Sequence, residues 1–152
     1  MADRTPGAHP LIARLGLEPH PEGGWYRRTW VAERVLDPDL DRRTGSAILY
    51  LLVEGETSAW HRLTDAEELW LHHDGAPLVL SCSPDGQRTT EVVLGPDVDA
   101  GQQPQAVVPV GCWQSARSTG HHTLVSCTVS PEFRFEGFEL APPCWTPGGD
   151  QV

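Results

Sequence analysis

The amino-acid sequence predicts an all-β protein, a sandwich or a barrel, preceded by one short helix. Short apolar runs follow one another along the chain, and turn formers such as Pro84-Asp85-Gly86 separate them. The 15 Gly and 14 Pro suit many tight turns. The expected strands span residues 25–31, 47–53, 58–63, 68–72, 78–82, 90–94, 106–110, 113–116, 123–129 and 133–140.

The helix is expected over residues 9–17. Pro10 suits its first turn, Leu11, Ile12 and Leu15 give a partial apolar face, and Gly16 ends it. Residues 37–44 are charged and predict a surface loop. The 152 residues suit one domain. We therefore expect a single domain over 11–141, between a flexible N-terminus (1–10) and a flexible C-terminal tail (142–152).

Composition excludes several classes of partner and of chemistry. The formal net charge is −10, all the basic side chains are Arg, and there is no Lys. Nucleic acid and anionic membrane are poor partners because both need a basic surface, and Schiff-base chemistry lacks its lysine. The N-terminus does not resemble a signal peptide and the four Cys form no C-x-x-C pair, so we expect reduced thiols in a cytoplasmic protein.

A histidine and a carboxylate seven residues apart give the strongest functional signal. His61 lies on one expected strand and Glu68 begins the next, with a polar turn between them. Alternation along the strands places Ala59 and Leu63 on the same face as His61, and His72 on the same face as Glu68. Imidazole and carboxylate inside a barrel suit a divalent metal ion (Zn²⁺, Fe²⁺, Mn²⁺ or Ni²⁺) or, without metal, an acid/base pair.

The spacing resembles the first cupin motif, G-x5-H-x-H-x(3,4)-E-x6-G, with Gly55, His61, Glu68 and Gly75 in register. Leu63 stands at the second histidine position. The later segment Pro109-Val110-Gly111-Cys112-Trp113-Gln114 resembles P-x-G-x-x-H of the second motif, with Gln114 at the histidine position.

Within the cupins, the chain resembles the DUF985 (Cupin_5) family from about Leu11 to Leu140. The segments that carry this resemblance are 17–27, 58–62, 68–70, 75–78, 108–116, 124–133 and 138–140. The resemblance implies a double-stranded β-helix, the cupin jelly roll, with a pocket inside the barrel and usually a homodimer. It implies no settled reaction, since members are described as epimerase-like. The chain departs from the family at Leu71, where a histidine is usual, and in a longer turn over 64–67.

The candidate residues fall into three groups. The catalytic candidates are His61, Tyr26 and Glu68, with Tyr26 as proton donor to the substrate. The substrate-binding candidates are Arg28, Arg62, Trp70, Trp113 and Gln114, with an arginine binding an acidic or phosphorylated metabolite. The metal candidates are His61, Glu68, Gln114 and His72.

Two functional hypotheses follow. The first is a small-molecule enzyme, an isomerase, epimerase or lyase, that uses either a metal or acid/base side chains on an oxygen-rich, acidic or sugar-like metabolite. The second is a non-catalytic cupin that binds a metabolite. Leu63 and Gln114, which replace two usual metal ligands, motivate the second hypothesis because they indicate a degraded metal site.

Overall fold

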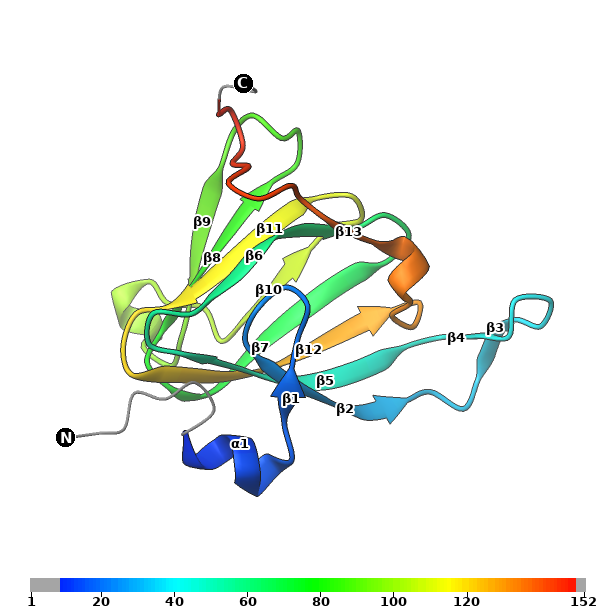
Figure 1. The fold of residues 1–152 in the computed structure, drawn as a ribbon, viewed down its shortest axis with the longest axis horizontal. Coiled ribbons are helices and arrows are strands. Elements are labelled where there is room, and N and C mark those ends of the chain that lie inside the picture. Colours follow the sequence, from blue (N-terminus) through cyan, green and yellow to red (C-terminus); the bar gives the residue numbers. More distant parts are fainter. Residues whose placement is uncertain (1–8, 150–152) are drawn as a thin grey trace.

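Two antiparallel β-sheets face each other and form the body of the protein in the computed structural model, which describes residues 9–149 (Figure 1). The larger sheet contains, in spatial order, β1 (Glu18–Pro19), β2 (Trp25–Val31), β5 (Ser46–Val53), β12 (His122–Ser130), β7 (Glu67–Gly75) and β10 (Gln105–Val108). The smaller sheet contains β13 (Phe138–Leu140), β6 (Thr57–Leu63), β11 (Trp113–Ser118), β8 (Leu78–Ser83) and β9 (Thr90–Leu94).

The chain crosses repeatedly from one sheet to the other. β5 and β7 belong to the larger sheet while β6 and β8 belong to the smaller one, and β10 to β13 alternate in the same way. As a result, β12 pairs with both β5 and β7, and β11 pairs with both β6 and β8, all antiparallel. This winding is the double-stranded β-helix, and the all-β jelly roll predicted from the sequence is confirmed.

The hydrophobic core lies between the two sheets, since alternate side chains of each strand point inward. Along β12, for example, Thr123, Val125, Cys127 and Val129 are buried and their neighbours are more exposed. The central core cluster contains Tyr50, Leu52, Trp70, Leu78, Leu80, Leu94, Val108 and Val125. A smaller cluster of Leu63, Ala66 and Val129, packed against Phe133 and Phe138, lies beside the cavity described below.

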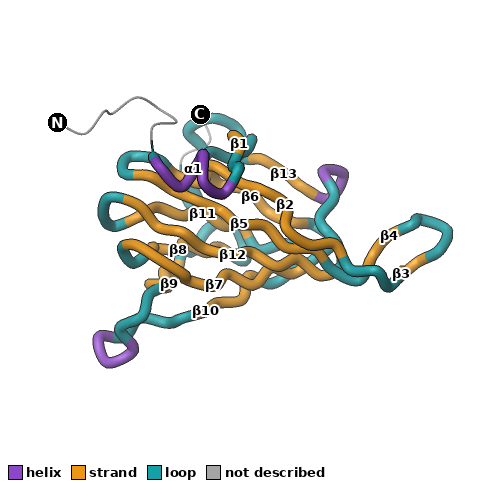
Figure 2. Tube along the Cα trace, turned by 90° about the horizontal axis from the view of Figure 1, so that it is seen from below, coloured by secondary structure: helices purple, strands orange, loops and turns teal. Residues whose placement is uncertain are grey.

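The N-terminal helix is shorter than the sequence predicts. Helix α1 spans Pro10–Leu15, and the His9 side chain accepts a hydrogen bond from the Leu11 N–H as its N-cap. Gly16 adopts a left-handed conformation with φ 63° and ends the helix. Figure 2 shows α1 lying outside the barrel.

Two expected elements differ from the structure for local reasons. The expected strand over 133–140 forms only as β13, because a 3₁₀ turn occupies Phe135–Gly137. The loop expected over 37–44 contains β4 (Arg42–Arg43), which pairs with β3 (Val35–Asp37) in a short hairpin that projects from the barrel (Figure 1).

The part of the C-terminal tail that the structure describes, residues 142–149, contacts the smaller sheet. The Trp145 ring lies 4.7 Å from the Trp113 ring between centroids, and the Gly148 N–H donates to the Gly86 carbonyl at 3.0 Å. Of the flexible ends expected over 1–10 and 142–152, residues 1–8 and 150–152 lie outside the described residues. Within residues 9–149, no helix is long and apolar enough to cross a membrane.

Candidate active site

His61 lies on β6 with its ring buried inside the barrel. The register between β6 and β11 shifts between the pairs Ser58–Ala116 and His61–Gln114, so β6 carries one extra residue there. This β-bulge turns both Ser58 and His61 inward and leaves Ala59 exposed, which corrects the inward position expected for Ala59. The Ala59 carbonyl lies 2.7 Å from His61 Nδ1. A carbonyl only accepts, so Nδ1 carries the proton and Nε2 points to the next partner.

That partner is Glu22, whose Oε2 lies 3.0 Å from His61 Nε2. Glu22 belongs to the turn between β1 and β2, and its own carbonyl accepts a hydrogen bond from the Ala59 N–H at 2.7 Å. The following Gly23 has a φ of 101°, and a Cβ there would lie 2.3 Å from the Thr57 carbonyl oxygen. Glycine therefore allows the turn to approach β6 closely enough to bring Glu22 into the barrel.

Burial favours the neutral form of both partners. The Glu22 side chain is 7% exposed, and burial raises its pKa from 4.5 to about 8. Burial also lowers the pKa of His61 from 6.5, although the charge of Glu68 opposes this shift. At neutral pH, Glu22 and His61 therefore hold one proton between Oε2 and Nε2, in addition to the proton on Nδ1.

A second buried carboxyl group, Glu68, enters the same cavity from β7. The Trp70 indole N–H donates to Glu68 Oε1 at 3.0 Å and to Gln114 Oε1 at 2.9 Å. Burial raises the pKa of Glu68 to about 7, and the nearby His61 opposes that shift. Glu68 therefore changes its charge close to neutral pH, as a general acid or base at that pH must.

These groups face a cavity of about 200 Å³ at one end of the barrel. This volume is below the roughly 300 Å³ at which drug-sized pockets begin, so it suits one small metabolite. The lining combines apolar with polar and ionisable side chains and consists of Glu18, His20, Glu22, Tyr26, Arg28, Ser46, Ala47, Ile48, His61, Leu63, Glu68, Cys127, Val129, Phe133, Phe135 and Phe138.

Aromatic rings form one wall of the cavity. The Phe138 ring stacks on His61 with centroids 5.5 Å apart, and Phe133 and Phe135 pack against Phe138. The His20 ring meets the Tyr26 ring edge-on at 4.6 Å and the Phe138 ring edge-on at 6.2 Å between centroids. Burial lowers the pKa of His20 to about 4, and its Nδ1 accepts the Glu22 N–H at 3.1 Å. His20 is therefore a neutral ring that also positions the backbone of Glu22.

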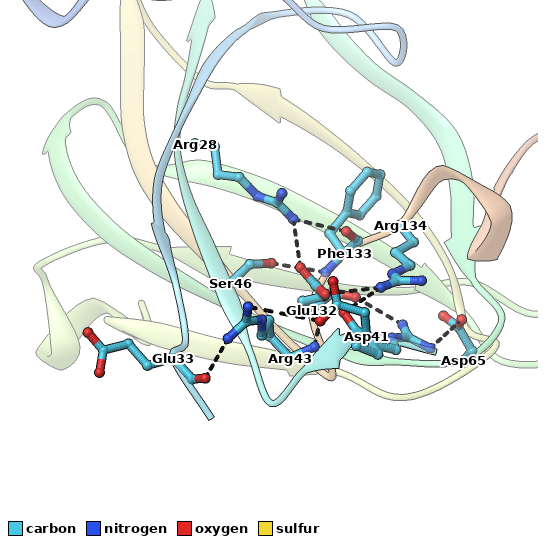
Figure 3. A network of polar contacts seen from close by, with 10 residues as sticks. Arg28, Glu33, Asp41, Arg43, Ser46, Asp65, Glu132, Phe133 and Arg134 are labelled. Carbon is cyan, nitrogen blue, oxygen red and sulfur yellow. Dashed lines mark hydrogen bonds and ion pairs between the residues drawn. The ribbon is translucent and has the colours of Figure 1, made fainter. Parts of the chain in front are cut away.

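Arg28 supplies the guanidinium group among these lining residues. Its Nη2 donates to the Phe133 carbonyl at 2.9 Å and lies 3.8 Å from Glu132 Oε2 (Figure 3). Arg43 and Arg134 also contact Glu132, through a backbone N–H at 2.9 Å and a guanidinium at 3.4 Å. Because its side chain is 42% exposed, Arg28 keeps donors free for a ligand that enters from solvent.

The structure brings four of the residues predicted for the site, Tyr26, Arg28, His61 and Glu68, to one cavity. Trp70 and Gln114 are buried behind Glu68, where the indole N–H orients the carboxyl group, and they do not line the cavity. Arg62 and Trp113 are also outside the lining: the Arg62 guanidinium lies 4.5 Å from the Trp113 ring centroid and pairs with Glu139 at 2.7 Å.

The four-residue metal site predicted from the sequence does not assemble. His72 Nε2 lies 3.0 Å from the Ala76 carbonyl and the residue is outside the cavity lining. His72 keeps the register of Glu68 and Trp70 against β12, because the shift comes only after it, at His73. It lies four residues farther along β7 than Glu68 and so does not reach the cavity. Gln114 Oε1 already accepts the Trp70 N–H, and Glu22 rather than Glu68 bonds the His61 ring. The donors around His61 therefore do not fit that metal set.

Sequence reasoning missed Glu22 and His20 as site residues. They lie about 40 residues before His61 in the chain, in a stretch that the glycines mark as a turn. The signal that could have identified them is the placement of two titratable side chains, His20 and Glu22, beside Gly23-Gly24 in a segment that carries the family resemblance. A turn that needs two adjacent glycines often approaches another backbone closely.

The fold and the buried polar cavity define a cupin, and sequence comparison names the family. The chain belongs to the cupin superfamily family DUF985 (Cupin_5), whose model matches residues 9–141. The predicted resemblance is therefore confirmed. No curated protein matches the chain.

Solved structures agree with this assignment. Protein SO0799 from Shewanella oneidensis is 41% identical, with a TM-score of 0.80 over 86% of this chain and 82% of that one. A hypothetical protein from Leishmania major is 30% identical, with a TM-score of 0.79 over 89% and 87% of the two chains. A dTDP sugar isomerase from Desulfovibrio desulfuricans G20 shares the fold at 19% identity, with a TM-score of 0.58 over 80% and 83%.

Proposed function

We propose that this cupin is an enzyme that moves a proton on a small carbonyl-bearing metabolite, as an isomerase or epimerase does. The observation that carries the proposal is the buried hydrogen bond between Glu22 and His61, 3.0 Å long, in a cavity that also contains Glu68. Buried acids with pKa values near neutrality are costly to keep in a fold and are typical of acid/base catalysis.

The two carboxyl groups suit different roles. Glu68, with a pKa raised by burial to about 7, is in part a carboxylate at neutral pH and accepts the proton from the carbon next to the carbonyl group. Glu22, with a pKa raised by burial to about 8, is protonated and delivers the proton that it shares with His61 to the substrate oxygen. Tyr26, in the same lining, binds that oxygen.

The substrate class follows from the lining. The cavity admits one small metabolite, and Arg28 at its edge binds a carboxylate or phosphate group of that molecule. The raised pKa values leave Glu22 mostly uncharged and Glu68 partly uncharged, which reduces repulsion of an anion. We therefore propose a keto acid or a phosphorylated sugar as the substrate.

The test is hydrogen exchange on carbon. Purified protein is incubated in D₂O with a panel of aldoses, ketoses, their phosphates and 2-keto acids, and deuterium on carbon is followed by NMR. We expect exchange on at least one compound, and a loss of about 100-fold or more in Glu68→Gln and Glu22→Gln. The control Glu67→Gln makes the same change at the exposed residue next to Glu68 and should keep the activity.

A second candidate, a cupin that only binds a metabolite, is favoured by one observation. Glu22 and His61 satisfy each other's hydrogen bonds without a ligand. A compound that binds in the cavity, loses affinity in Arg28→Ala and yet never exchanges its carbon-bound hydrogens would support this candidate and refute the enzyme.

Two expectations from the sequence accompany the proposal. We propose a homodimer, supported by the family resemblance, and size-exclusion chromatography with light scattering tests it. We also propose a cytoplasmic location, which suits four cysteines of which none is paired in the structure described here.

A further inference from the structure

We propose that His9, His121 and His122 form a second site, outside the cavity, that binds a divalent transition-metal ion such as Zn²⁺. One ring nitrogen of each histidine lies within 4.8 Å of those of the other two. Three neutral imidazoles and one open position form a ligand set that zinc accepts. The proposal does not depend on the function proposed for the cavity.

The three rings come from two parts of the chain that meet at the surface. His9 is the N-cap of helix α1, His122 is the first residue of β12, and His121 directly precedes that strand. The His9 ring centroid lies 4.6 Å from that of His122 and 5.6 Å from that of His121. A metal–nitrogen bond is about 2.0–2.1 Å long, so small side-chain rotations bring the three rings around one ion.

The His122 ring is already oriented for such a role. Its Nε2 lies 3.0 Å from Asp74 Oδ2, so this nitrogen donates to the carboxylate and leaves Nδ1 for the metal. A carboxylate behind a metal-binding imidazole fixes its tautomer and raises its basicity. Gly75 makes room for the ring, since a Cβ there would lie 2.9 Å from His122 Nε2.

The backbone on both sides of the ring pair is also held. The His121 carbonyl accepts the Glu54 N–H at 2.8 Å, and the His122 carbonyl accepts the Ala76 N–H at 2.8 Å. His121 itself is exposed and free to rotate toward the ion. The His9 carbonyl likewise accepts the Ile12 N–H at 3.0 Å. Three held backbones, with two partly buried rings and one exposed ring that can adapt, meet the geometric need of a site that is partly formed before the metal arrives.

A carboxylate beside the three rings favours a cation at this place, since Asp74 Oδ2 lies 3.0 Å from His122 Nε2. Neutral imidazole is the form that binds metal.

A metal at this site would connect helix α1 to the barrel. The helix has six residues, far fewer than the roughly 12–15 that an isolated helix needs to be marginally stable in water. The neutral His9 ring has one lone pair, which accepts the Leu11 N–H at 3.3 Å in the metal-free protein and would pass to the ion. Binding would thus replace this cap hydrogen bond with a link from the helix to the histidines at the start of the neighbouring strand. This gives the proposal a readout other than activity.

The experiment uses full-length protein without a histidine tag, treated with chelator, and titrates it with ZnCl₂ at pH 7.5 in a calorimeter. We expect one equivalent of Zn²⁺ to bind and to raise the melting temperature. The double variant His121→Ala/His122→Ala and the single variant His9→Ser should lose this binding. Serine preserves the N-cap, so His9→Ser tests the ligand and not the helix. Asp74→Ala should weaken binding about 10-fold.

Two matched controls separate this site from other histidines. His73→Ala removes an exposed histidine of β7, and His61→Ala removes the cavity histidine; both should bind Zn²⁺ as the unchanged protein does. No binding by the unchanged protein, unchanged binding in the double variant, or loss of binding in His61→Ala would each overturn the proposal.

Discussion

Replacing Glu22 by Gln should change how the stability of the protein depends on pH. The substitution keeps the shape of the side chain and allows an amide N–H to donate to His61 Nε2, but it removes the titrating group. In the native protein, burial raises the pKa of Glu22 from 4.5 to about 8. Between these values the folded state holds a proton on Glu22 that the unfolded state has released, so the free energy of unfolding falls as the pH rises.

The size of the effect follows from the shift. At about 1.4 kcal/mol per pH unit, the rise in the pKa of Glu22 from 4.5 to about 8 contributes about 5 kcal/mol to the free energy of unfolding. This contribution is fully present below pH 4.5 and is lost as the pH rises to 8. Between pH 5 and pH 7.5, we expect the free energy of unfolding of the native protein to fall by about 3 kcal/mol more than that of Glu22→Gln. The variant is thus relatively more stable at the alkaline end.

Urea unfolding followed by tryptophan fluorescence measures this difference at several pH values. Other buried groups also titrate, with His20 opposing and Glu68 reinforcing the trend. The comparison with Glu22→Gln removes their contribution because both proteins contain them. Glu67→Gln, at an exposed position, controls for the loss of a carboxyl group. A difference between native protein and Glu22→Gln that stays constant from pH 5 to 7.5 would refute the reasoning.

Three further predictions concern the support and the entrance of the cavity. Trp70→Phe removes the N–H that serves both Glu68 and Gln114 and should lower the free energy of unfolding by about 2–4 kcal/mol, measured in urea. Gly23→Ala places a Cβ 2.3 Å from a carbonyl oxygen at a φ of 101° and should cost at least about 2 kcal/mol, seen as a lower melting temperature. Arg28→Ala should leave the melting temperature nearly unchanged, since the side chain is 42% exposed. In calorimetry the same variant should bind a phosphorylated ketose about 10-fold more weakly but bind the free ketose as the native protein does. Stability equal to that of the native protein in the first two variants, or equal losses for both ketoses in the third, would contradict these expectations.

The fold was predictable because the signals that define it are local. Alternation and turn residues from Ala47 to Val129 mark each strand, and the spacing of His61 and Glu68 between Gly55 and Gly75 identifies the cupin register. The observed strands differ from the expected ones by a few residues at two places. One strand ends before Pro109, which has no backbone N–H to donate, and another begins only after the 3₁₀ turn that precedes Phe138.

The partner of His61 was not predictable in the same way. Glu22 reaches the ring from a turn about 40 residues earlier, and only the packing of that turn against β6 brings the two together. Alternation placed His72 on the same face of β7 as Glu68, which holds, but His72 lies too far along the strand to reach the cavity. Strand alternation failed at the bulge in β6, which leaves Ala59 exposed. A bulge adds one residue to a strand, so the residues that follow it lie on the opposite face from the one that simple alternation predicts.

The state of the His61 ring tests the account most directly. NMR of protein labelled with ¹⁵N in histidine distinguishes imidazole protonated on Nδ1, on Nε2 or on both. We predict that at pH 7 His61 is neutral and protonated on Nδ1, with Nε2 accepting the proton of Glu22, and that this form persists as the pH falls through 6.5. A His61 ring protonated on both nitrogens at pH 7, or a neutral ring with its proton on Nε2, would contradict the shared proton on which the proposed chemistry rests.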